Sequence, residues 1–171
     1  MAKKITEKRL YNIALCYLSR YEATTGKVRD VLKRRLMTAE RRGEEIPNEA
    51  PAWIEKIIAQ MVDLGYIDNN RYAENTFRRL TEAGKSVRSI AYKLKQAGLE
   101  EDVLSDLIEE QETTSGELDL TSALKLVKKR KLGLYRPESQ RAAYAQKDLA
   151  VLGRAGFSYE IAQKALKGEE D

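Results

Sequence analysis

Apolar residues recur along this chain at the three- and four-residue spacing of amphipathic helices, with polar or turn-forming residues between the stretches. No stretch shows the alternation of apolar and polar residues that is typical of a strand. The pattern therefore predicts an all-α protein with nine helical segments. Their apolar stripes fall in residues 10–21, 28–39, 54–62, 70–83, 87–94, 103–108, 120–127, 145–155 and 161–166.

A short unit occurs three times, in residues 61–66, 94–99 and 152–157. Each copy has an apolar residue, a glycine four positions later, and an apolar or aromatic residue directly after the glycine. Glycine behind an apolar stripe is the usual end of a helix, because it adopts the left-handed conformation without strain. We therefore expect Gly65, Gly98 and Gly156 to end helices at positive φ. The residues that follow them, including Tyr66 and Phe157, should pack back on those helices.

The repeated unit also predicts how the chain is organised. Each copy is followed by a second short helical pattern, and the polar, turn-rich stretch 111–116 is a good boundary. We expect three modules of three helices in residues 1–67, 68–115 and 116–171. Because each module is marginal alone and gains stability by stacking on its neighbour, an elongated and curved helical repeat is favoured over a globe.

Composition narrows the range of functions. The 171 residues include no histidine and a single cysteine, so the usual zinc sites and histidine-based catalytic groups cannot be assembled. We expect no catalytic residues, no metal and no cofactor. No run of 18 apolar residues predicts a membrane helix, and the N-terminus lacks the apolar core of a signal peptide. The cytoplasm is the expected compartment.

The net charge is only +4, but the charges are segregated along the chain. Residues 99–121 contain nine acidic residues and no Lys or Arg. Basic runs in all three predicted modules favour an anion-binding face, which would contact DNA phosphate or an acidic protein surface. The alternative is that the basic and acidic runs are ordinary solvated helix faces. The candidate binding residues are Arg34, Arg35, Arg41, Arg42, Arg78, Arg79, Lys85, Arg88, Lys93, Lys95, Lys128, Lys129, Arg130 and Lys131.

One run of the sequence is more specific. Residues 64–73, Leu-Gly-Tyr-Ile-Asp-Asn-Asn-Arg-Tyr-Ala, resemble the signature of the RecX family of recombinase regulators. Residues 14–20, 84–99 and 152–161 resemble further segments of that family, in the same order. Within the signature, Asp68 is expected to cap a helix, Tyr72 to pack in the core, and Arg71 either to pair with Asp68 or to contact a partner. The residues that carry the family motifs are Gly65, Tyr66, Asp68, Arg71, Tyr72, Gly98, Gly156 and Phe157.

The resemblance implies a partner and an activity. The partner would be RecA assembled as a filament on single-stranded DNA, with this protein bound as a monomer along the filament groove. It would inhibit the ATPase of RecA, strand exchange and filament growth, and so modulate DNA repair, recombination and the SOS response. Direct, sequence-independent contact with single- or double-stranded DNA is a further expectation.

Two other classes of function stay open from the residues alone. A helical protein that binds DNA non-specifically and independently of RecA would bind bare DNA as tightly as the filament. A metal-dependent nuclease that uses carboxylates alone would need acidic residues gathered in a pocket, whereas the acidic residues of 100–110 are spaced as an exposed helix face.

Overall fold

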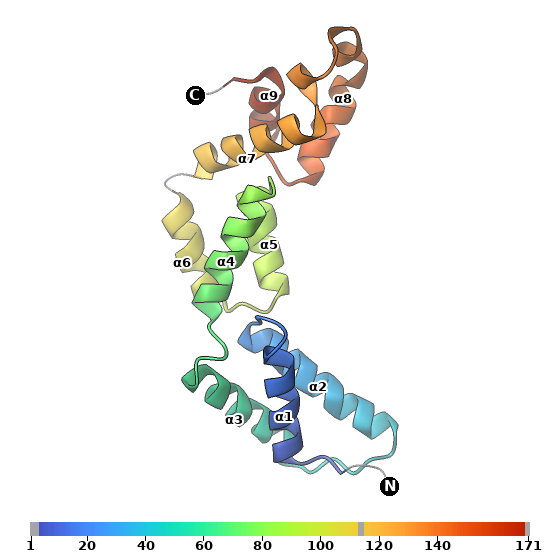
Figure 1. The fold of residues 1–171 in the computed structure, drawn as a ribbon, viewed down its shortest axis with the longest axis vertical. Coiled ribbons are helices and arrows are strands. Elements are labelled where there is room, and N and C mark those ends of the chain that lie inside the picture. The colour runs from blue at the N-terminus through green and yellow to red at the C-terminus, as the bar shows by residue number, and fades with distance from the viewer. Residues whose placement is uncertain (1–3, 113–114, 170–171) are drawn as a thin grey trace. The chain divides into compact units, whose positions relative to one another are not determined.

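The computed structural model describes residues 4–112 and 115–169, and within these ranges every regular element is helical (Figure 1). This confirms the all-α prediction, and each predicted segment corresponds to one α-helix. The helices are α1 (Glu7–Leu18), α2 (Thr25–Arg41), α3 (Ala50–Asp63), α4 (Asn69–Glu82), α5 (Val87–Gln96), α6 (Glu101–Glu112), α7 (Ser115–Arg130), the short 3-10 helix η1 (Gly133–Tyr135), α8 (Glu138–Arg154) and α9 (Tyr159–Lys167).

The described residues pack as two units, which divide within α4. Unit 1 contains residues 4–72 and the segment Gln96–Glu100, and unit 2 contains Ala73–Lys95 and the described residues from Glu101 onward. The three modules expected from the repeated unit stay a prediction. The predicted turn at 111–116 is helical where it is described, because residues 111–112 belong to α6 and residues 115–116 to α7. Residues 113 and 114 lie outside the described ranges.

Unit 1 is built around the apolar stripes of α1, α2 and α3, which contact one another pairwise. The Thr6 hydroxyl caps α1 by accepting a hydrogen bond from the backbone N–H of Arg9 at 3.2 Å. Ile5 and Leu10, on either side of this cap, are both fully buried in the same core. This arrangement fixes the direction in which the chain enters α1.

Unit 2 has its own core, in which α7, α8 and α9 pack together. A buried carboxylate fixes η1 to this core: Asp148 of α8 accepts hydrogen bonds from the Arg136 guanidinium at 2.7 Å and from the backbone N–H of Gly133 at 3.0 Å. These bonds from Arg136 hold the pKa of Asp148 below its ordinary value, although burial of the carboxylate opposes the shift.

The three glycines of the repeated unit behave as expected. Gly65, Gly98 and Gly156 have φ of 73°, 76° and 97°, and each follows a helix. Leu99 and Phe157, directly after the second and third glycines, are buried. The prediction is wrong for Tyr66, which is 48% exposed, because Ile67 occupies the buried position instead and is 2% exposed. Tyr72, also expected in the core, is half-buried.

Candidate functional site

The sequence between α4 and α5 is fixed to both α7 and α8 of unit 2. The hydroxyl of Ser86 caps α5 by accepting from the N–H of Ser89 at 3.1 Å, and it donates to the carbonyl oxygen of Ala155 at 3.2 Å. Gly156 lies so close that a Cβ there would be 3.1 Å from the Cβ of Ser89. We call this arrangement of Ser86, Ser89, Ala155 and Gly156 the Ser86 junction.

Two further contacts tie the same segment to α7. The carboxylate of Asp119 accepts a hydrogen bond from the backbone N–H of Val87 at 2.8 Å. Burial raises the pKa of Asp119 above its ordinary value, and the bond from Val87 opposes that shift. Gly84 approaches α7 closely, since a Cβ there would lie 3.2 Å from the carbonyl oxygen of Ser122. Lys85, between Gly84 and Ser86, is therefore held beside α7 and next to the end of α8.

Four basic side chains line one cavity at this place. The cavity has a volume of about 310 Å³ and is bounded by residues 83–85, by α7 and by the end of α8. It is lined by Lys85 of the α4–α5 segment, by Lys129 and Arg130 of the last turn of α7, and by Arg154, the last residue of α8. Its remaining lining is small or aliphatic: Ala83, Gly84, Leu126, Val151 and Ala155. We call it the cationic pocket.

The charges of the cationic pocket are not balanced by carboxylates. Among the described residues, none of Lys85, Lys129, Arg130 and Arg154 forms an ion pair or a side-chain hydrogen bond. The pocket lining contains no acidic residue. Four like charges around one cavity repel one another, so an anion there would be attracted by all four.

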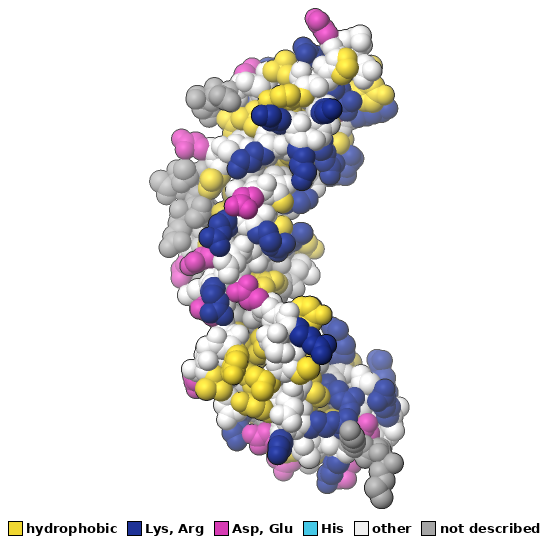
Figure 2. Space-filling model, in the orientation of Figure 1, with side chains coloured by type: hydrophobic (Ala, Val, Ile, Leu, Met, Phe, Trp, Pro, Cys, Tyr) yellow, Lys and Arg dark blue, Asp and Glu magenta, His cyan; other side chains and the backbone are white. Residues whose placement is uncertain are grey.

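The other predicted basic residues are spread over several helices. Arg34, Arg35 and Arg41 lie on α2, with Arg42 as its C-cap; Arg78 and Arg79 lie on α4, and Arg88, Lys93 and Lys95 on α5. On the face shown in Figure 2, Lys and Arg side chains gather over α7 and α8. Two of the predicted residues have local partners: Arg78 donates to Asn75 at 2.9 Å, and Lys95 pairs with Glu101 at 3.1 Å. Of the predicted set, the structure brings Lys85, Lys129 and Arg130 together at the cationic pocket.

Sequence reasoning does not identify Arg154. It is an isolated charge in the sequence, outside every basic run. A signal for it does exist, because Arg154 lies within the third copy of the repeated unit, directly before Ala155 and Gly156. Only the fold shows that this copy packs against the segment that carries Lys85.

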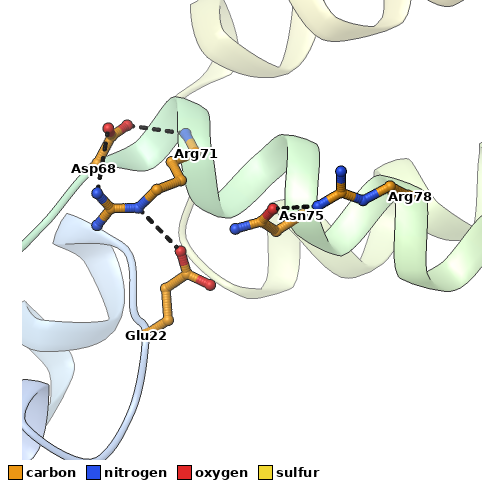
Figure 3. Close-up of polar contacts among 5 residues, drawn as sticks. All are labelled: Glu22, Asp68, Arg71, Asn75 and Arg78. Atoms are coloured by element: carbon orange, nitrogen blue, oxygen red, sulfur yellow. Dashed lines mark hydrogen bonds and ion pairs between the residues drawn. The ribbon is translucent and has the colours of Figure 1, made fainter.

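In unit 1, Asp68 and Arg71 of the signature form a polar cluster with Glu22 (Figure 3). Asp68 caps α4 by accepting from the backbone N–H of Arg71 at 2.9 Å, which confirms the expected cap. The Arg71 guanidinium donates to Glu22 at 3.3 Å and lies 3.9 Å from the second oxygen of Asp68. Of the two roles considered for Arg71, the structure supports pairing with Asp68 and adds Glu22 as a second partner.

A second junction in unit 1 has the same construction as the Ser86 junction. The Thr24 hydroxyl caps α2 by accepting from the N–H of Lys27 at 3.0 Å, and it donates to the carbonyl oxygen of Ala97. Gly98 follows, and a Cβ on it would lie 2.9 Å from the Cα of Gly26. We call this arrangement of Thr24, Gly26, Ala97 and Gly98 the Thr24 junction. Close by, Asn69 of the signature exchanges two hydrogen bonds with Thr25, at 3.0 and 3.1 Å.

A larger cavity lies in unit 1 but has mixed chemistry. Its volume is about 880 Å³, and Tyr11, Trp53 and Leu64 line it beside charged residues of both signs. Elsewhere, no group of three or more acidic or cysteine side chains within residues 4–112 and 115–169 is arranged to hold a metal ion. None of the helices in these ranges combines the length and apolar character that crossing a membrane requires.

Comparison with known proteins adds evidence of a different kind. No family model matches the chain. It is 33% identical over 165 residues to "Regulatory protein RecX" of Myxococcus xanthus, covering 96% of this chain and 87% of that protein. It is 31% identical to "Regulatory protein RecX" of Agrobacterium fabrum, covering 91% of this chain and 80% of that protein. The crystal structure of RecX from Lactobacillus salivarius matches the fold with a TM-score of 0.63 at 22% identity, covering 95% of this chain and 96% of that one.

Proposed function

This chain belongs to the RecX family of regulatory proteins, and we propose that it regulates RecA by binding RecA filaments on single-stranded DNA. Bound along the filament groove, it inhibits the ATPase of RecA, strand exchange and filament growth, and thereby modulates recombination, repair and the SOS response. It acts as a monomer in the cytoplasm and without catalytic residues of its own. Any fall in ATP hydrolysis is then a change in RecA.

The cationic pocket is the structural observation that best supports this proposal. A filament on DNA offers phosphate groups and protein surface together, and the pocket presents four cations whose charge no described residue neutralises. Basic side chains that contact phosphate position a protein on nucleic acid without reading its sequence. A regulator of a filament that forms on any sequence needs binding of this kind.

RecA ATPase activity on single-stranded DNA tests the proposal directly. Increasing amounts of this protein should lower the steady-state rate until it reaches a plateau, and the protein should co-sediment with the filaments. The matched control is this protein with bare single-stranded DNA at the same salt concentration. An ATPase rate that stays unchanged at saturating protein would refute the proposal.

The same experiment separates the runner-up function. A non-specific DNA-binding protein that acts independently of RecA would sediment equally with bare DNA and with filaments. Inhibition would then follow only from competition for DNA, and excess single-stranded DNA would relieve it fully. Under the proposed function, binding to the filament is tighter than to bare DNA, because RecA supplies additional contacts.

A further inference from the structure

We infer that the cationic pocket of unit 2 binds a phosphodiester group of the single-stranded DNA backbone. The inference rests on the proposed function, and it names the side chains that contact the strand: Lys85, Lys129, Arg130 and Arg154. It concerns unit 2 alone and does not depend on the identity of the RecA surface that the protein contacts.

The fold fixes the backbone next to two of the four cations, Lys85 and Arg154. Gly84 lies against α7, and Ser86 is bonded to the end of α8, so the intervening Lys85 has little freedom to move its backbone. Arg154 directly precedes Ala155, whose carbonyl accepts that bond. Buried contacts thus fix the two segments that carry Lys85 and Arg154 against each other before any ligand arrives. Preorganisation of this kind reduces the entropy cost of binding.

Helix dipoles stabilise cations of the pocket that lie at helix ends, but they do not neutralise the charge of the pocket. Lys129, Arg130 and Arg154 lie in the last turns of α7 and α8, where cations interact favourably with the negative end of the helix dipole. That interaction is modest and falls off within one turn. Lys85 lies outside both helices, three residues after the end of α4, and lines the same cavity. An external anion in the cavity would interact with all four cations.

The lining identifies the class of anion. Cations reach the cavity from three segments of chain, which suits the tetrahedral array of oxygens on phosphorus better than the planar oxygens of a carboxylate. No aromatic side chain lines the pocket, so it lacks the aromatic rings on which the bases of single strands usually stack. The backbone N–H groups of Gly84 and Lys85 already bond to carbonyls of α4, which leaves recognition to the charged side chains. Such a pocket binds the backbone of any sequence.

The test compares two variants that remove the same charge. The pocket variant is Lys85→Gln/Lys129→Gln/Arg130→Gln/Arg154→Gln, and the control variant is Lys93→Gln/Lys125→Gln/Lys128→Gln/Lys131→Gln. All eight residues belong to unit 2, and none of the control residues lines the cationic pocket. Affinity for a fluorescein-labelled oligothymidylate is measured by anisotropy over a range of salt concentrations. Circular dichroism and thermal melting verify that both variants fold.

The expected result is a difference between the two variants. The affinity of the pocket variant should fall about tenfold or more, and that of the control variant should stay within about threefold of wild type. The reason is that a cation in direct contact with a phosphate contributes more to affinity than a cation elsewhere on unit 2. The slope of log affinity against log salt should become shallower by about 0.7 for each phosphate that the variant no longer neutralises. Equal weakening of both variants would overturn the inference, as would wild-type protein that fails to bind the oligonucleotide at low salt.

Competitors identify the source of the anion. Unlabelled oligothymidylate should displace the labelled strand from wild-type protein. Inorganic phosphate and ATP should do so only weakly, since they can occupy the pocket but cannot make the contacts that the rest of a strand makes with the protein beside it. Polyglutamate that competes as well as DNA of equal charge would show that the pocket takes carboxylates, and would overturn the inference. Failure of the pocket inference leaves inhibition of RecA by wild-type protein intact, and failure of the proposed function appears as absence of that inhibition.

Discussion

The Thr24 junction of unit 1 and the Ser86 junction of unit 2 have the same backbone construction and different charge. In each, the hydroxyl that caps a helix donates to the carbonyl of an alanine, and a glycine at positive φ follows that alanine. The residue before the capping hydroxyl is Ala23 in the first junction and Lys85 in the second, and the residue before the alanine is Gln96 in the first and Arg154 in the second.

The difference shows that one structural joint can serve packing alone or also carry a binding site. Ala23 is buried, so the Thr24 junction has no charge at that position. Two arginines of unit 1 are paired: Arg29 with Glu55 at 2.8 Å and Arg71 with Glu22 at 3.3 Å. The bond from Arg29 also holds the pKa of Glu55 below its ordinary value. Lys85 and Arg154, which directly precede Ser86 and Ala155 of the Ser86 junction, have no such partners among the described residues and are free to attract an anion.

The largest expected effect is a loss of stability when a methyl group is added at the Thr24 junction, where Gly98 and Gly26 lie close together. A Cβ at Gly98 would lie 2.9 Å from the Cα of Gly26, and Gly98 also has positive φ. Gly98→Ala should therefore cost roughly 3 kcal/mol, because overpacking adds to left-handed strain. Gly65→Ala is the control, since Gly65 has a similar φ and open space around it, and should cost about 1–2 kcal/mol. Urea unfolding measures both, and equal destabilisation would show that the close approach is unimportant.

Removing the capping hydroxyl should lower stability at both junctions, but should lower DNA affinity only at the Ser86 junction. Thr24→Val and Ser86→Ala should each cost about 1–2 kcal/mol, because the helix has no cap and the alanine carbonyl has no donor in either variant. Only Ser86→Ala should also weaken binding to oligothymidylate, since Lys85 adjoins Ser86 and no pocket cation adjoins Thr24. Thermal melting and anisotropy give the two readouts. An equal fall in DNA affinity in both variants would contradict the division of roles.

The sequence predicts what depends on neighbours along the chain. The helices, the positive φ of the three glycines, and the cap at Asp68 all follow from residues within one helical turn. It does not predict which charges are neutralised, because those pairs join distant positions: Arg71 and Glu22 are 49 residues apart, and Arg29 and Glu55 are 26 apart. For the same reason, the sequence predicts the cationic pocket only as separate basic runs and does not include Arg154.

Two carboxylates of unit 2 should respond oppositely to removal of their charge. The pKa of Asp148 is lowered, so its stabilising contribution is complete above the ordinary carboxyl pKa of about 4 and is lost as pH falls through the lowered value. The pKa of Asp119 is raised, so the stability linked to it declines as pH rises through that raised value.

Asp148→Asn should lower the Tm by several degrees at neutral pH. Asp119→Asn can still accept the bond from Val87 and should leave the Tm equal or higher. Thermal melts from acid to neutral pH measure both, and a lower Tm for Asp119→Asn would contradict the assignment.

The smallest effect concerns a cation of the basic run that lies outside the pocket. Lys131 follows α7 with φ of 53°, the only described residue other than glycine at positive φ. Lys131→Gly should raise stability by about 0.5–1 kcal/mol, since glycine adopts this conformation without strain. Lys128→Gly removes the same charge from within the helix and should lower stability by about 1 kcal/mol. Because neither residue lines the cationic pocket, oligothymidylate affinity should change little in both. A large fall in affinity in either variant would mean that the whole basic run binds DNA, and that the contrast between the two junctions is less sharp than the pocket implies.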